Sequence, residues 1–234
     1  MTIIIMVFSI IIIFTCAFLK SLKEGLTNNE HIVLIGDSVL NNSIYVPFGK
    51  SVFDILKTKT PNIFNFAEDG AKINDCYSQI DKIPAELNKT GTYIFISVGG
   101  NDILNKNENL EGPLIKQLFN NNSFGYRLRS SVAHRRLRLR LAPYMELIKS
   151  ARTKFEGAKI NVLNLYLPTN PHYQSYKQTV IQWNALINEY SSKADEMYNV
   201  INLYTLLTTP SDFIYDIEPS ESASQKIANV IYLT

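Results

Sequence analysis

Short apolar runs alternate with longer stretches of helical periodicity along this chain. Each run lacks charged side chains, which is typical of strands buried on both faces of a sheet. The five runs that predict strands cover residues 32–36, 63–66, 93–98, 160–166 and 200–203. The stretches that predict helices lie near residues 52–58, 73–83, 112–120, 126–155, 173–198 and 222–233. Because strands that alternate with helices form parallel sheets, we expect an α/β fold, a three-layer α/β/α sandwich around five parallel strands.

The first twenty residues differ from this pattern. Residues 3–19 carry no charge, and Ser9 and Thr15 are the only polar interruptions. This length is marginal for the roughly 30 Å of hydrocarbon in a bilayer, and we expect a hydrophobic helix that anchors the chain in a membrane. A cleaved signal peptide is an alternative, since Thr15 and Ala17 have the spacing that a signal peptidase reads, and an N-terminal core helix is another. The predicted organisation is an anchor or signal segment (1–20), a linker (21–30) and one domain (31–234).

The flanks of the apolar segment leave the location of the domain open. Lys20 and Lys23 follow the segment, which by the positive-inside rule favours a cytoplasmic domain. Glycosylation triplets at Asn41, Asn88 and Asn121 instead suit a lumenal domain. We therefore expect a single-pass membrane protein, whose domain faces either side of the membrane, or a secreted protein after signal cleavage.

Composition narrows the class of protein. The chain has 234 residues, of which 46% are apolar and 19% charged, an ordinary balance for a globular domain. Of the two cysteines, Cys16 lies in the apolar segment and Cys76 is alone in the domain. Neither a disulfide within the domain nor a zinc site built on thiolates is therefore expected.

The net charge of +2 conceals a local concentration of arginine. Six arginines lie from Arg127 to Arg140, and the rest of the chain carries a net charge of −4. Such a run is typical of a solvated helix face, and it also suits contact with anionic lipid headgroups. No nucleic-acid-reading motif accompanies the charge, so nucleic acid is not an expected partner.

Small and polar residues follow each of the first four predicted strands. The first strand is followed by Asp37 and Ser38, the second by residues 67–70, the third by 99–102 and the fourth by 168–170. The carboxyl ends of parallel strands border the crevice in which such sheets bind ligands. Each group has a structural explanation, because glycine permits tight turns and Ser, Asp and Asn cap helices. Together they indicate a site at one edge of the sheet.

Three of these groups resemble the sequence blocks of a known family. "GDS" after the first strand, Gly70 after the second and "GGND" after the third resemble, in order and spacing, the first three blocks of the SGNH or GDSL hydrolases. These are serine esterases and lipases with a flavodoxin-like fold, and the resemblance spans residues 31–234. It implies that Ser38 is the nucleophile. It also implies an oxyanion hole formed by the amides of Ser38 and Gly70 and the side chain of Asn101.

Two further carboxylates and a histidine lie at the same edge. We interpret Asp37 as structural, with its carboxylate accepting hydrogen bonds from loop amides. Asp37, Asp102 and His172 are also our candidates for contact with substrate, because each follows a predicted strand.

The final block of the family departs from its pattern here. The family supplies a catalytic histidine from a D-x-x-H-P block before the last helix, and this chain reads "DFIYDIEPS" there. When the Pro-Ser pair is aligned, Glu218 occupies the histidine position and Tyr215 the position of the supporting aspartate, with Asp216 one position late. The three histidines of the chain, His31, His134 and His172, all lie elsewhere.

Three explanations compete for the missing histidine. Glu218 accepts the proton of Ser38, with Asp216 raising its basicity; or His172 reaches the site from the loop after the fourth strand; or the site has lost catalysis, and the domain binds a glycan or a protein. Retention of Ser38, Gly70 and Asn101 favours the first explanation. We therefore expect an esterase with a carboxylate base that acts on an O-acyl ester, such as an O-acetyl ester, of a carbohydrate or lipid. No metal or organic cofactor is implied.

Overall fold

The computed structural model describes residues 29–104, 125–193 and 198–234, and its centre is a parallel sheet. The sheet has the strand order β2-β1-β3-β4-β5, and every pair is parallel, so the prediction of five parallel strands is confirmed. The order reverses beside β1, where doubly wound folds bind their ligands. The strands are β1 (His31–Gly36), β2 (Ile63–Asn65), β3 (Thr92–Ser97), β4 (Lys159–Leu163) and β5 (Asn199–Ile201).

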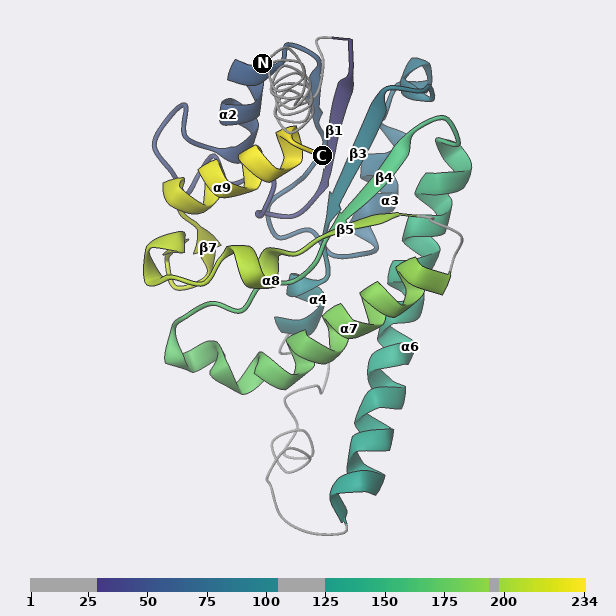
Figure 1. Cartoon of the computed structure of the whole chain (residues 1–234), viewed down its shortest axis with the longest axis vertical. Helices are drawn as coiled ribbons and strands as arrows, with labels where there is room; N and C mark the ends of the chain where they lie inside the picture. Colours follow the sequence, from purple (N-terminus) through teal and green to yellow (C-terminus); the bar gives the residue numbers. More distant parts are fainter. Residues whose placement is uncertain (1–28, 105–124, 194–197) are drawn as a thin grey trace, which may run out of the picture.

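Helices cover both faces of the sheet, which confirms the three layers (Figure 1). One face packs against α2 (Val52–Lys59) and α9 (Glu221–Tyr232), and the other against α3 (Asp75–Asp81), α6 (Gly125–Lys154) and α7 (Lys177–Lys193). Alternation along β1 feeds both cores, because Ile32 and Leu34 belong to the first and Val33 and Ile35 to the second.

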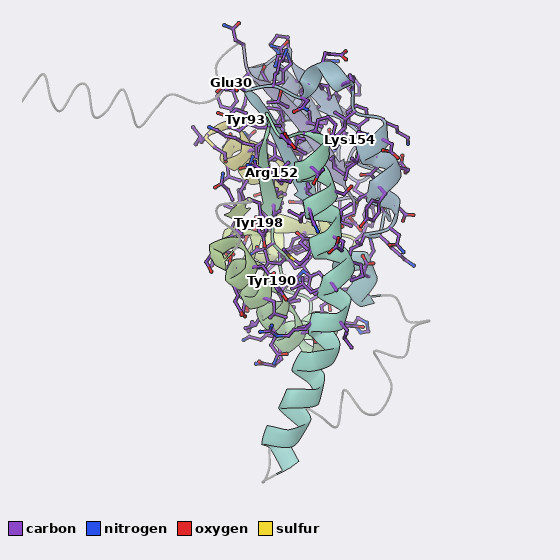
Figure 2. The ribbon with its side chains drawn as sticks, turned by 90° about the vertical axis from the view of Figure 1, so that its right-hand side faces the viewer. Glu30, Tyr93, Arg152, Lys154, Tyr190 and Tyr198 are labelled. Carbon is purple, nitrogen blue, oxygen red and sulfur yellow. The ribbon has the colours of Figure 1, made fainter. Side chains whose placement is uncertain are left out.

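Capping residues mark the beginning of the two helices, α2 and α9, that flank the carboxyl edge. Ser51 forms a capping box with Asp54 at the start of α2, and the Ser220 hydroxyl accepts a hydrogen bond from the Ala223 amide at the start of α9. On the opposite face, α6 runs along the sheet in the side view of Figure 2, where Lys154 is labelled. Lys154 Nζ contacts Asp81 Oδ1 at 2.8 Å and thereby ties α6 to the end of α3.

Several predicted boundaries are wrong, because side chains from other elements end the strands and helices. The strand predicted over 160–166 ends at Leu163, since Asn184 on α7 binds both the amide and the carbonyl of Leu165. The strand predicted over 200–203 ends at Ile201, because Asn202 caps the next helix.

The helix predicted over 173–198 is divided, and other short elements were not predicted. A 3-10 turn, η2 (Pro171–Tyr176), precedes α7, and Tyr198 lies outside the helix, with its hydroxyl donating to Ile187 O at 2.7 Å. The helix predicted over 73–83 is shorter at both ends. The unpredicted elements are η1 (Ala85–Leu87), α4 (Gly100–Leu104), α8 (Leu203–Leu206), η3 (Pro210–Asp212), β6 (Phe213–Ile214) and β7 (Glu218–Pro219).

Two other predictions fall outside the described residues. The apolar segment 3–19 and the helix predicted over 112–120 both lie there. Among the helices of the three described ranges, none combines the length and apolarity that a membrane crossing requires.

The arginine-rich helix packs on the sheet through one face. Leu137 and Leu141 of α6 are buried, whereas Arg138 is exposed and contacts Glu189 of α7 at 3.2 Å. An ion pair at the surface contributes about 0–1 kcal/mol, so packing rather than this pair holds α6 in place. The predicted contact of Arg127–Arg140 with anionic lipid stays a prediction.

The last residue of β1 lies where no side chain fits. Gly36 has φ +134°, and a Cβ placed there would lie 1.8 Å from Ser97 O of β3. The fully buried Gln79 of α3 binds both peptide groups of Gly36, accepting from its amide at 2.7 Å and donating to its carbonyl at 3.0 Å. The end of β1 is therefore fixed against both β3 and α3.

Gly36→Ala should destabilise the fold severely, by at least about 3 kcal/mol, because strain in φ and overlap with Ser97 add together. Gly49→Ala is the matched control: Gly49 also has a positive φ of +79°, but its Cβ would meet nothing within 4 Å. We expect the control to lose only about 1–2 kcal/mol. Urea unfolding measures both, and equal losses would show that the approach of Ser97 is unimportant.

Candidate active site

A crevice opens at the carboxyl edge of the sheet, where the sequence predicts a site. Ser38, Asn101 and Glu218 line it from three separate segments of the chain, together with Asp37. The remaining wall is largely apolar and aromatic, and comes from α4, the loop after β4, η2, the start of α7 and the segment before β7. Its apolar members include Leu104, Leu165, Leu167, Tyr173, Tyr176, Val180 and Ile217.

Ser38 is presented by a turn. The carbonyl of Asp37 accepts hydrogen bonds from the amides of Leu40 and Asn41, both at 3.1 Å, and its carboxylate accepts from the Val39 amide at 3.1 Å. No helix begins at Ser38, because the next helix along the chain, α2, starts at Val52. The amides near Ser38 therefore belong to a tight turn, without a helix dipole behind them.

Glu218 faces Ser38 across the crevice. It lies on β7, which pairs with β6 in a short hairpin, and its carboxylate is within hydrogen-bonding reach of the Ser38 hydroxyl. Burial raises the pKa of Glu218, the hydrogen bond from Ser38 lowers it, and the charge of Asp69 raises it further. Glu218 Oε2 is buried and has no hydrogen-bond partner among the described residues. The side chain therefore combines a raised pKa with direct access to a hydroxyl.

The carboxylate whose charge raises the pKa of Glu218 is Asp69, not the sequence neighbour Asp216. Asp216 is exposed, and no influence of its charge on Glu218 is evident, whereas Asp69 raises the pKa of Glu218. The turn of the hairpin explains this, since Tyr215 and Asp216 both adopt positive φ, 48° and 72°. Asp69 follows β2, and its Oδ2 accepts a hydrogen bond from the Tyr45 hydroxyl at 2.9 Å.

Asp37 is buried beside these groups. Burial, followed by the charges of Glu218 and Asp102, raises the pKa of Asp37 to about 7, although the Val39 amide opposes the shift. Two neighbouring carboxyl groups with raised pKa values disfavour being charged together. Near neutral pH the crevice therefore tends to hold fewer negative charges than its sequence implies.

Of the residues expected to supply oxyanion donors, Ser38 and Asn101 line the crevice. Asn101 Nδ2 donates one hydrogen bond to Ala71 O at 3.0 Å, which fixes the amide and leaves its second hydrogen available. Gly70 has a φ of +73° and is exposed, and it is absent from the described lining. Asp102 is also absent from this lining, and its Oδ2 accepts from the Ile73 amide at 3.2 Å. Asp102 therefore holds the loop after β2 against α4.

No family model matches the sequence. The protein YpmR of Bacillus subtilis is 24% identical over 259 residues, covering 95% of this chain and 91% of YpmR. Solved structures with the same architecture include a lipolytic protein of the G-D-S-L family from Veillonella parvula, with a TM-score of 0.56, 17% identity and coverage of 86% of this chain and 94% of that one.

Two further solved structures share this architecture. Phospholipase A1 from Streptomyces albidoflavus has a TM-score of 0.58 and 13% identity, covering 87% of this chain and 97% of its own. An extracellular lipase from Streptomyces rimosus has a TM-score of 0.56 and 15% identity, covering 86% and 99%. The chain has the SGNH hydrolase fold. At these identities the likeness concerns the fold, and the chemistry depends on the residues of the crevice.

Within this SGNH fold, His172 does not lie among the described residues that line the crevice. It is exposed on η2, where its ring makes an edge contact with Tyr173 at 5.2 Å between centroids. Tyr173 and Tyr176 of the same turn face the crevice instead. The explanation in which His172 replaces the missing base therefore gains no support from the geometry.

Sequence reasoning missed Asn42, a residue that ties together two segments lining the crevice. Asn42 is fully buried, and its Nδ2 donates to Pro219 O at 3.0 Å and Ser224 Oγ at 2.6 Å, while its Oδ1 accepts from the Val52 amide. It therefore ties the segment after Ser38 to the residue after Glu218. Its only sequence signal is a polar side chain close behind the first block.

Asp37→Asn should change how stability depends on pH. The folded pKa of about 7 lies above the ordinary 3.8, so the folded state binds the proton more tightly, and ionisation of Asp37 lowers stability as pH rises from about 4 through 7. A shift of roughly three units corresponds to about 4 kcal/mol at most. Asparagine can keep the bond from Val39 without this penalty.

Urea unfolding at several pH values between 4 and 8 measures the effect. This range covers most of the interval between the ordinary pKa of Asp37, 3.8, and its folded pKa of about 7. Asp37→Asn should lose less stability than the wild type on going to the higher pH. Parallel curves for the two proteins would show that Asp37 is ionised throughout.

Proposed function

We propose that the chain hydrolyses carboxylic esters, with Ser38 as nucleophile and Glu218 as general base. The observation that carries this proposal is the approach of the Ser38 hydroxyl to the Glu218 carboxylate inside a crevice that Asn101 also lines. A nucleophile and base within hydrogen-bonding reach are the requirement for covalent acyl transfer.

The reaction proceeds in two balanced steps. Ser38 Oγ forms a bond to the ester carbonyl carbon while its proton passes to Glu218, and the oxyanion takes up hydrogen bonds that include one from Asn101 Nδ2. Collapse of this intermediate breaks the bond to the alkoxide, which receives the proton from Glu218. Water then attacks the acyl-Ser38 ester and gives a proton to Glu218. When the bond between the acyl carbon and Ser38 Oγ breaks, Glu218 returns this proton to Ser38 Oγ, and the carboxylic acid is released.

The environment of Glu218 supports its use in place of histidine. An ordinary glutamate titrates near 4.3 and is a weaker base than histidine at about 6.5. Burial and the charge of Asp69 raise the pKa of Glu218 and so increase its basicity. A base with a pKa nearer the working pH combines ionisation with proton affinity.

The crevice walls favour an uncharged acyl group. Leucine, isoleucine, valine and tyrosine side chains line the space beside Ser38, and Leu104, Leu165 and Val180 lie among them. The three solved structures named above are described as lipolytic proteins or lipases of this fold. We infer an O-acyl ester of a lipid or carbohydrate as the substrate class.

Fluorophosphonate labelling tests the nucleophile and the base together. Wild-type protein, full length and in detergent, should be labelled, Ser38→Ala should not, and Glu218→Gln should be labelled roughly 100- to 10,000-fold more slowly. Asn101→Ala should reduce ester hydrolysis by roughly 100- to 1,000-fold. Asp216→Asn and His172→Asn serve as controls on exposed residues, and both should retain activity.

One observation favours a second function, a binding module without catalysis. Glu218 Oε2 has no partner among the described residues, whereas the base of a Ser-His-Asp triad is oriented by a third group. A folded wild type that takes no label and hydrolyses no short-chain ester would support this second function and refute the first.

The pH profile provides an independent test of Glu218. Labelling should increase as pH rises through the pKa of Glu218, because only the carboxylate accepts a proton. Asp69→Asn removes the charge that raises this pKa, while its side-chain oxygen can still accept from Tyr45. The profile should therefore move to lower pH in Asp69→Asn. An unshifted profile would indicate that another group limits the reaction.

A further inference from the structure

Three strongly exposed apolar side chains lie on the two loops next to Ser38 and Glu218. Phe48 is fully exposed, and Ile44 and Tyr215 are 70% and 71% exposed. Phe48 and Ile44 lie between β1 and α2, and Tyr215 lies in the turn of the β6–β7 hairpin. We call these three residues the apolar rim. Single exposed apolar residues are common, but a cluster marks a contact surface.

Aromatic contact joins the two loops of the apolar rim. The rings of Tyr45 and Tyr215 lie 6.1 Å apart between centroids, at an interplanar angle of 60°. Tyr45 also donates to Asp69, whose charge acts on Glu218. The rim is therefore one surface that borders the proposed base, and Figure 1 shows β7 on the same side of the molecule as the segment between β1 and α2.

The loop that carries Phe48 is held at both ends, which keeps its tip away from the fold. Asn42 anchors its start on β7 and α9. At its end, the Lys50 amide donates to Pro47 O at 3.0 Å, and Lys50 Nζ contacts Glu221 at 2.7 Å. The apolar tip is thus presented in a fixed conformation, so little ordering is needed when it binds.

We propose that the apolar rim inserts into the surface of a lipid bilayer. Its members are strongly exposed, and none lies among the described residues that line the crevice. Residues 42–49 carry no charge and are followed by Lys50. Such an uncharged tip beside a cation, with a tyrosine at its margin, suits the boundary between hydrocarbon and headgroups.

The sequence outside the described residues points to the same partner. Residues 3–19 are uncharged, and only nine residues, 20–28, separate them from the described chain. Nine residues span at most roughly 30 Å, so an apolar segment in a bilayer would hold the domain near its surface. If the proposed hydrolysis is correct, insertion of the rim would bring the crevice to esters held in that bilayer.

Tryptophan fluorescence in the full chain tests the insertion directly. Phe48→Trp and, as a matched control, Leu233→Trp would be reconstituted into vesicles of phosphatidylcholine and phosphatidylglycerol in equal parts, with and without bromine on the acyl chains near the headgroups. Leu233 is 63% exposed at the end of α9 and lies outside the rim. The native Trp183 is buried, and its signal in the wild type is subtracted.

Phe48→Trp emission should shift to the blue and lose intensity in brominated vesicles, whereas Leu233→Trp should do neither. Quenching of Leu233→Trp alone, equal quenching of both, or quenching of neither would overturn the proposal. A blue shift of Phe48→Trp that grows with protein concentration, without bromine quenching, would overturn it in favour of contact between two copies. Repeating the measurement in Ser38→Ala separates the proposals, because insertion does not require catalysis.

Discussion

The approach of β1 to β3 at Gly36 is the constraint on which the crevice depends. Because position 36 carries no side chain, the backbone can pass directly against Ser97, and the two strands end level with each other. The Asp37 amide then donates to Ser97 O at 3.0 Å, which starts the turn that presents Ser38. The next residues of β3 lead into the helix that carries Asn101. One steric requirement therefore places Ser38 and Asn101 along the same crevice.

Glu218 lies on the opposite wall of the crevice, and the hydrogen bonds that hold this wall in place do not involve the Glu218 side chain. Asp212, fully buried, accepts hydrogen bonds from the Thr208 and Thr209 amides and from Lys226 Nζ at 2.7 Å. Burial alone would raise the pKa of Asp212, but Lys226 and Thr209 lower it overall. This network fixes the base of the hairpin to α9, so the backbone beside Ser38 can hold a glutamate where the family has histidine.

The sequence predicts the sheet well because its signal is local. Apolar runs mark β1 and β3 almost residue for residue, whereas the ends of β4 and β5 depend on Asn184 and Asn202, whose contacts no short window reveals. For the site, the blocks indicate Ser38 and Asn101, and the Pro-Ser alignment indicates Glu218. Asp69 could not be assigned to Glu218, because the two meet only in the folded chain.

The site joins the two ends of the domain. Ser38 follows the first strand and Glu218 precedes the last helix, and Asn42 bonds Pro219 across 177 residues of chain. Contacts of such separation carry a large loop-closure cost and form late in folding. During synthesis, the crevice is incomplete until α9 has left the ribosome. A nascent or truncated chain would therefore have an unassembled site, and reactivity at Ser38 would report that the whole domain has folded.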